Sequence, residues 1–196
     1  MSDILELLSV NVGLPRTILV HKDGPIVSAI AKRPLEMRSA MVRKANLDGD
    51  RQADLRVHGG ADKAIYAYSA DNWEWWSAEH GLRCAPATFG EKLTLAGGDE
   101  NGVRIGDRFR WGEPLLEVSE PRAPCYKFGI HTHRPDAPSL MTSSARCGWY
   151  LRVLEEGHAP TRGEFTRTVH GQWPHCARGF RCPVAREHTR FVPARA

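Results

Sequence analysis

The stretch EPRAPCYKF, residues 120–128, places a cysteine where a reactive thiol could form. Arg122 and Lys127 flank Cys125 closely, and Pro124 suits the first position of a helix. Nearby cations and a helix N-terminus both favour the thiolate, which is the form that attacks electrophiles and binds metals. A buried, inert thiol with two surface cations beside it fits the spacing equally well, because free cysteine is among the most buried residue types.

Three weaker candidates lie elsewhere in the chain. In VHGGADK, His58 precedes Gly59 and Gly60, and paired glycines let a ligand approach backbone amides. A strand-turn-strand with a solvated histidine explains the same residues equally well. Lys32 in AIAKRPL and Glu91 in FGEKL are each more often solvated side chains than ligand contacts.

Several common site types are not supported by the sequence. There is no GxSxG, Walker or GxGxxG motif. The Asp-Gly run at residues 48–50 lacks the twelve-residue calcium pattern that ends in Glu. The histidines and cysteines after residue 168 do not have zinc spacing. The tryptophans at 73, 75 and 76 alternate with acids rather than bases, and a net charge of +4 is too small to imply nucleic-acid binding.

Composition indicates a globular, reduced protein. The chain has 196 residues, 41% hydrophobic and 26% charged, which suits one large domain or one domain with an appendage. No segment approaches the roughly 20 apolar residues of a membrane span, and the first residues lack a secretory pattern. Five scattered cysteines argue against a disulfide framework. We expect a cytoplasmic protein with no membrane partner.

The elements that position these residues are mainly short strands. Alternating apolar segments predict strands at 5–12, 25–31, 41–45, 64–69, 92–95, 107–111, 115–119 and 148–154. Capping residues predict a helix that starts at Ser69 or Asp71 and ends at Gly81, a second helix spans 139–146, and a helical turn starts at Pro124 or Cys125. The pattern predicts a mainly β fold with a few helices (α+β), as a barrel or sandwich. The tail from Thr168 has no apolar period and is expected to be irregular.

Five segments in order resemble the MOSC domain family, and most of all its small stand-alone bacterial members of YiiM type. They are AIAKRPL, LDGDRQADLRVHGGADKAIYAY, FGEKL, IGDRFRWGEPLLEVSEPRAPCYKF and GWYLRVLEEG. The resemblance implies a MOSC-type β-barrel over residues 1–167, followed by an irregular tail at 168–196 where the family has three helices. Lys92 is a departure, because the family has asparagine at that position.

The resemblance also implies a function. Cys125 would be the catalytic ligand to the metal of a molybdenum cofactor (molybdopterin). Lys32, Arg122 and Lys127 would neutralise its phosphate and pterin oxygens. His58, Gly59 and Gly60 would line the same pocket, and Glu91 would orient a ring nitrogen or a water.

The expected activity is reduction of N-hydroxylated small molecules, such as hydroxylaminopurine-type base analogues, and so detoxification. Electrons would come from an external donor protein, and a homodimer is possible. Two alternatives remain. The chain could be a non-catalytic carrier of sulfur or cofactor, a role that the family also fills beside pyridoxal-phosphate enzymes, or a structural domain whose chemistry has decayed.

Overall fold

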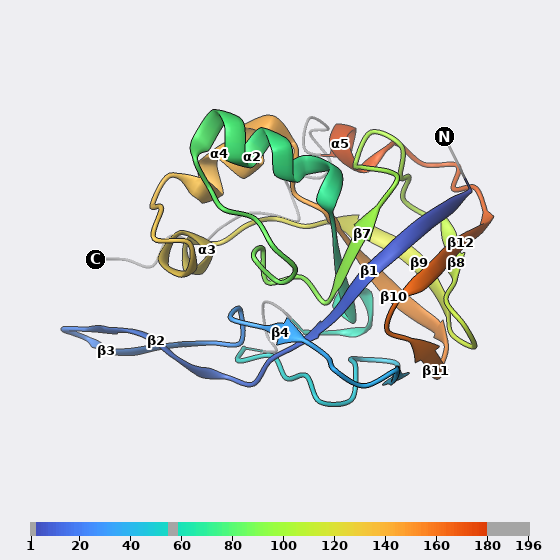
Figure 1. Ribbon diagram of the computed structural model, residues 1–196, viewed down its shortest axis with the longest axis horizontal. Helices are drawn as coiled ribbons and strands as arrows, with labels where there is room; N and C mark the ends of the chain where they lie inside the picture. Colours follow the sequence, from blue (N-terminus) through green and yellow to red (C-terminus); the bar gives the residue numbers. More distant parts are fainter. Residues whose placement is uncertain (1–2, 55–58, 180–196) are drawn as a thin grey trace.

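The computed structural model describes residues 3–54 and 59–179 of the chain, and most of its regular elements are strands (Figure 1). The strands are β1 (Ile4–Val12), β2 (Arg16–His21), β3 (Gly24–Ser28), β4 (Arg33–Pro34), β5 (Ser39–Val42), β6 (Ile65–Ser69), β7 (Leu93–Ala96), β8 (Arg108–Arg110), β9 (Leu115–Pro121), β10 (Trp149–Glu155), β11 (Gly157–Pro160) and β12 (Gly163–Val169). The helices are α2 (Trp73–His80), α3 (Tyr126–His131), α4 (Ala137–Ser144) and α5 (Cys176–Gly179), with 3-10 turns η1 (Ala61–Lys63) and η2 (Ala70–Asn72).

Within the described residues, seven strands close into a barrel. Their order is β12-β8-β9-β10-β6-β7-β1, and β1 pairs again with β12, while β4 extends the sheet beside β1. Only β6 and β7 run parallel among these described pairs. Closure pairs the edges of the sheet, which would otherwise be open to other chains. The predicted fold class, mainly β with a few helices and a barrel, is confirmed.

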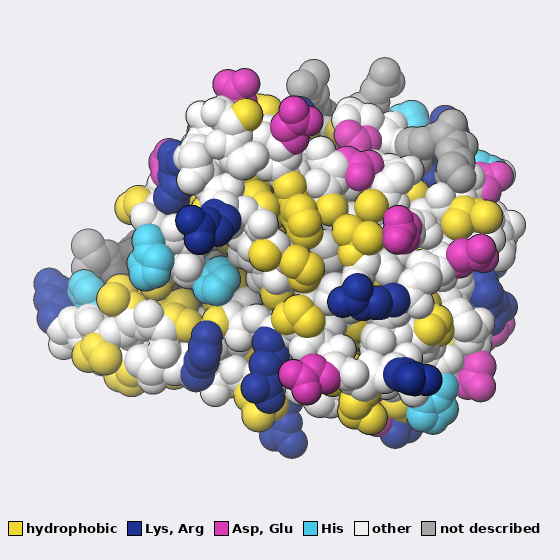
Figure 2. All heavy atoms as spheres, in the orientation of Figure 1, with side chains coloured by type: hydrophobic (Ala, Val, Ile, Leu, Met, Phe, Trp, Pro, Cys, Tyr) yellow, Lys and Arg dark blue, Asp and Glu magenta, His cyan; other side chains and the backbone are white. Residues whose placement is uncertain are grey.

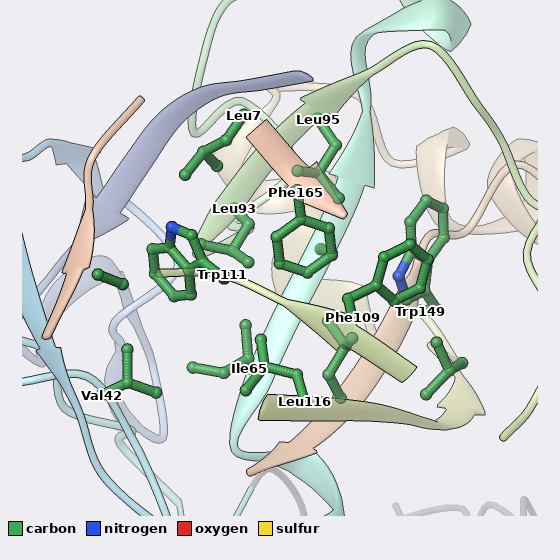
Figure 3. Packing of buried hydrophobic residues seen from close by; sticks show 14 of the residues in the cluster. Leu7, Val42, Ile65, Leu93, Leu95, Phe109, Trp111, Leu116, Trp149 and Phe165 are labelled. Atoms are coloured by element: carbon green, nitrogen blue, oxygen red, sulfur yellow. The ribbon is translucent and has the colours of Figure 1, made fainter. Parts of the chain in front are cut away.

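The barrel interior is filled by apolar side chains from successive strands (Figure 3). Leu5 and Leu7 of β1 point inward at alternate positions, as the period of a strand requires. Phe109 of β8 stacks on Phe165 of β12 with ring centroids 4.8 Å apart. Burial of these large side chains is the main favourable term for the barrel.

A second apolar cluster holds the helices against one end of the barrel, where α2, α3 and α4 lie together in Figure 1. Trp76 of α2 is fully buried, and its indole nitrogen donates to the hydroxyl of Tyr68 at 2.6 Å. Phe128 of α3 packs in the same cluster. This packing fixes α3, and therefore the cysteine that precedes it.

The predicted helices are present with shifted ends. Ser69 accepts a hydrogen bond from the backbone nitrogen of Asp71, and the segment ends at Gly81 with a φ of 63°. The second helix begins two residues early, at Ala137, and the turn after Pro124 is α3. Strand β2 was not predicted from the sequence, because it belongs to a two-stranded hairpin that is exposed on both faces and so shows no alternation.

The start of the predicted irregular tail packs against the barrel. Strand β12 continues to Val169, and the backbone nitrogen of Gly171 donates to Asp107 at 2.6 Å. Cys176 is fully buried, and its backbone nitrogen donates to Val103. Of the segment expected to be irregular, residues 168–169 belong to β12 and 176–179 form α5, while residues 170–175 form no helix or strand. Residues 180–196 lie outside the described residues, and a division of the chain after residue 167 stays a prediction.

None of the helices in the described ranges is long and apolar enough to span a membrane.

Candidate functional site

A pocket opens where β9 leads into α3, and it encloses about 630 Å³ including its open mouth. Its wall contains residues from the loop after β3, the segment at 51–54, η1 and β6. Residues from the turn before β7 and from strand β10 complete it. Among the described residues of the wall, one has a carboxylate, Asp54, and six have cationic side chains, namely Lys32, Arg51, Lys63, Lys92, Arg122 and Lys127. Low-dielectric walls of one sign of charge concentrate oppositely charged ligands. The pocket therefore suits an anion.

The basic character extends to the outer surface of the molecule. Figure 2 shows Lys and Arg side chains along the lower edge of the face, around strand β4. Strand β4 follows Lys32 directly, so the loop that carries this lysine runs from the pocket to that surface. An anionic ligand approaching from that side meets attractive charge before it reaches the pocket.

Cys125 lies on the pocket wall at the start of α3. Its backbone is extended, with φ −121° and ψ 166°, and its carbonyl accepts from the backbone nitrogen of Phe128 at 3.0 Å. The thiol is half-buried. The packing of Phe128 in the aromatic cluster and the prolines on the N-terminal side hold this cysteine at the pocket.

Arg122 is a buried cation at the same wall, only 5% exposed. Its guanidinium lies 4.7 Å from the ring centroid of Tyr66, and one of its nitrogens lies 3.3 Å from the sulfur of Met141. No carboxylate of the described residues lies within ion-pair distance of it. Burial acts to lower the pKa of Arg122, but its neighbours Tyr66, Tyr150 and Cys125 outweigh burial and raise it, so the group stays charged.

Two lysines share one buried aspartate at another part of the wall. Asp50 accepts from Lys32 and from the backbone nitrogen of Gly13 at 2.9 Å. The ammonium of Lys92 lies 3.3 Å from the second carboxylate oxygen, a distance that attracts although the alignment is poor for a hydrogen bond. Burial lowers the pKa of Lys92 to about 8, and Asp50 opposes this shift. When all three groups are ionised, the Lys32–Asp50–Lys92 cluster has a net charge of +1.

The remaining predicted cation, Lys127, is half-buried and also lines the pocket. Its ammonium donates to the carbonyl of Val27 at 2.9 Å and so ties α3 to the β2–β3 hairpin. Of the predicted site residues, the fold thus brings Lys32, Arg122, Cys125 and Lys127 to one pocket.

Glu91 has a different position from the one predicted. Its carboxylate is fully buried and accepts from the backbone nitrogens of Ala87 and Phe89 and from the hydroxyl of Thr94, at 2.7 to 2.9 Å. These bonds fix the turn that presents Gly90 to the pocket. A β-carbon at Gly90 would lie 2.6 Å from Ile30, and its φ is 74°. The expectation that Glu91 contacts a ligand is corrected: it shapes the turn.

The two glycines predicted to line the pocket, Gly59 and Gly60, are not on its wall. Gly60 is exposed with a φ of 102°, where it begins η1, and neither it nor Gly59 is among the described residues of the wall. His58 lies outside the described residues. Sequence reasoning missed Asp50, Lys63, Tyr66 and Tyr150, and it noted Lys92 only as a departure from the family. The apolar residues of β6 and β10 predict strands, but they do not show which of the tyrosines face a pocket.

Glu91 gives a testable pH dependence. Burial raises its pKa from 4.5 to about 7, against the hydrogen bonds that it accepts. Between these pH values the unfolded chain releases the proton and the folded chain keeps it, so Glu91 makes the free energy of unfolding fall as pH rises, by up to about 3 kcal/mol. We expect urea unfolding of Glu91→Gln to lack this decline relative to wild type, whereas exposed Glu74→Gln retains it. A decline of equal size in Glu91→Gln would contradict the assignment.

Comparison with known proteins identifies a common family. The sequence profile of the MOSC domain matches residues 54–162. The chain is 40% identical over 152 residues to the uncharacterized protein YflK of Bacillus subtilis, covering 78% of this chain and 68% of YflK. It is 41% identical over 134 residues to the protein YiiM of Escherichia coli, covering 66% of this chain but only 59% of YiiM. A Gibberella moniliformis protein named "Reductase" is 33% identical, over 69% of this chain and 24% of its own length.

Solved structures give the same result for the fold. YiiM of Geobacillus stearothermophilus superposes with a TM-score of 0.72 at 30% identity, covering 88% of this chain and 80% of that chain. YiiM of Escherichia coli superposes with a TM-score of 0.66 at 30% identity, covering 76% of this chain and 74% of that chain.

Proposed function

The chain belongs to the MOSC domain family, and we propose that it binds a molybdenum cofactor in the pocket at Cys125 and there reduces N-hydroxylated compounds. The family is associated with this cofactor, and one relative is named a reductase. Binding of the cofactor and the choice of substrate are proposals for this chain.

The residues of the pocket fit such a group. A cysteine thiolate is a soft donor that suits a molybdenum centre. The single observation that carries the proposal is Arg122, which is buried at the wall beside Cys125 with no described carboxylate as partner. Burial penalises the charge of Arg122, and an anionic group of a ligand would offset that penalty. Lys32 and Lys127 would hold further oxygens of the same ligand.

The reaction requires an electron source. Reduction of R–NHOH takes two electrons and two protons, breaks the N–O bond and yields R–NH₂ and water. The bound metal would supply the two-electron step, while the chain orients the substrate and holds the cofactor. We propose an external electron-donor protein as the source. The relative named "Reductase" is consistent with this, since this chain matches only 24% of its length.

One experiment separates a reductase from a cofactor carrier. The full chain is purified from a host that makes the cofactor, its metal content is measured, and it is incubated with a reduced viologen dye and 6-hydroxylaminopurine. We expect about one molybdenum atom per chain and oxidation of the dye with formation of the amine. Adenine, which has no N–O bond, is the control substrate. Molybdenum without turnover would favour the carrier, and absence of molybdenum would overturn the proposal.

A further inference from the structure

The pocket holds more buried positive charge than its own acids cancel. In the Lys32–Asp50–Lys92 cluster, the exposed fractions of the three side chains are 6%, 0% and 4%, and one carboxylate faces two ammonium groups. Arg122 adds a third buried cation. These four groups therefore have a net charge of +2 when all of them are ionised.

Lys92 does not itself offer hydrogen bonds to a ligand. Its ammonium donates to the side-chain oxygen of Asn46 at 2.5 Å and to the carbonyl of Ala64 at 2.6 Å, and its third direction faces Asp50. Lys32 is the other cationic partner of the same carboxylate, and it also lines the pocket. A charge on Lys92 thus acts on a ligand through Asp50 and Lys32, as a positioning residue does.

We propose that Lys92 makes this pocket selective for a doubly charged anion, because it cancels Asp50 and leaves the charge of Lys32 for the ligand. The inference rests on the proposed function, according to which the bound dianion is the phosphate group of the cofactor. A dianion would match the two uncompensated charges, one from the cluster and one from Arg122. A monoanion would leave one of them unpaired in a low-dielectric site.

The protonation of Lys92 gives this selectivity a pH dependence. Its pKa of about 8 means that it is charged at neutral pH and becomes neutral above pH 8. The charged groups that face it are Asp50 and Lys32, while Asn46 and Ala64 contribute neutral oxygens. When Lys92 loses its proton, Asp50 cancels Lys32 and the pocket loses one positive charge. Glu91 has a pKa of about 7, so it ionises mostly before pH rises through the range in which Lys92 loses its proton.

Binding of inorganic sulfate tests the proposal, because sulfate remains a dianion throughout this pH range. The full chain is purified from cells that do not make the cofactor, and sulfate affinity is measured by calorimetry at about pH 7.5 and pH 9. We expect the affinity of the wild type to fall about tenfold over this interval, as one nearby charge is lost. Lys92→Gln, which keeps an amide donor, is expected to bind about tenfold more weakly at the lower pH and to be insensitive to the change. The affinity for nitrate, a monoanion, is expected to fall less than that for sulfate, both with pH in the wild type and from the wild type to Lys92→Gln.

Lys22→Gln is the matched control, since it removes one positive charge at an exposed site of the hairpin turn. It is expected to keep wild-type sulfate affinity and pH dependence. Equal sulfate affinities of Lys92→Gln and wild type would overturn the proposal. A wild-type sulfate affinity that does not change between about pH 7.5 and pH 9 would also overturn it, and that measurement needs no variant. Failure of the proposed function would appear instead as wild-type protein without molybdenum, whatever the sulfate result.

Discussion

Cys125→Ser, produced in a host that makes the cofactor, is expected to contain less than about one tenth of the molybdenum of the wild type. The hydroxyl of serine is a harder and much less acidic donor than a thiol, so it does not replace a thiolate at a soft metal site. The side chain is half-buried at a pocket wall and the two residues are nearly the same size, so we expect the fold to persist. Metal analysis measures the molybdenum content, and circular dichroism of the same samples shows whether the fold persists.

Cys84→Ser is the matched control for this experiment. Cys84 is also a half-buried free thiol, but it is not on the pocket wall, and burial raises its pKa to about 12, which makes it a poor thiolate. This variant is expected to keep the full molybdenum content. Equal molybdenum in Cys125→Ser and wild type would refute Cys125 as the metal ligand.

Asp50→Ala is expected to lower the free energy of unfolding by about 3–5 kcal/mol. Asp50 is the carboxylate that both Lys32 and Lys92 face, and its side chain is fully buried. Its removal leaves two buried ammonium groups close together without a counter-ion, and it also leaves the backbone nitrogen of Gly13 without its acceptor. Urea unfolding at neutral pH measures the effect as a shift of the midpoint.

Asp48→Ala provides the comparison for that experiment, two positions away. Asp48 accepts two hydrogen bonds of 3.0 Å from Arg43, but both side chains are about half exposed. In the variant, water can therefore form the hydrogen bonds that Arg43 loses. Little change of the midpoint is expected. Adding Lys92→Met to Asp50→Ala should recover part of the stability, because it removes one of the two repelling charges. Equal midpoints for Asp50→Ala and Asp48→Ala would show that the buried cluster does not stabilise the fold.

The local elements of this protein can be predicted from its sequence to a large extent. Alternating apolar residues such as those of β1 indicate strands, because side chains of a strand face opposite sides in turn. Ser69 and Gly81 mark the limits of the segment that contains α2, since each supplies a terminal interaction or conformation that a helix end needs. The PRAPCYK segment singles out Cys125 with two cations, and the family resemblance gives the barrel.

The charge balance of the pocket was decided by the tertiary structure alone. Asp50 is 18 residues from Lys32 in the sequence, and β6 and α2 separate both from Lys92, so only the tertiary fold brings the three together. Residues 91–95 are all buried, so alternation could not show that Lys92 faces an acid or that Glu91 is turned inward. The periodicity of apolar residues in the sequence indicates which residues share a face of one helix or strand. The burial and pairing of charges depend on which elements meet, and that is fixed by contacts between distant segments.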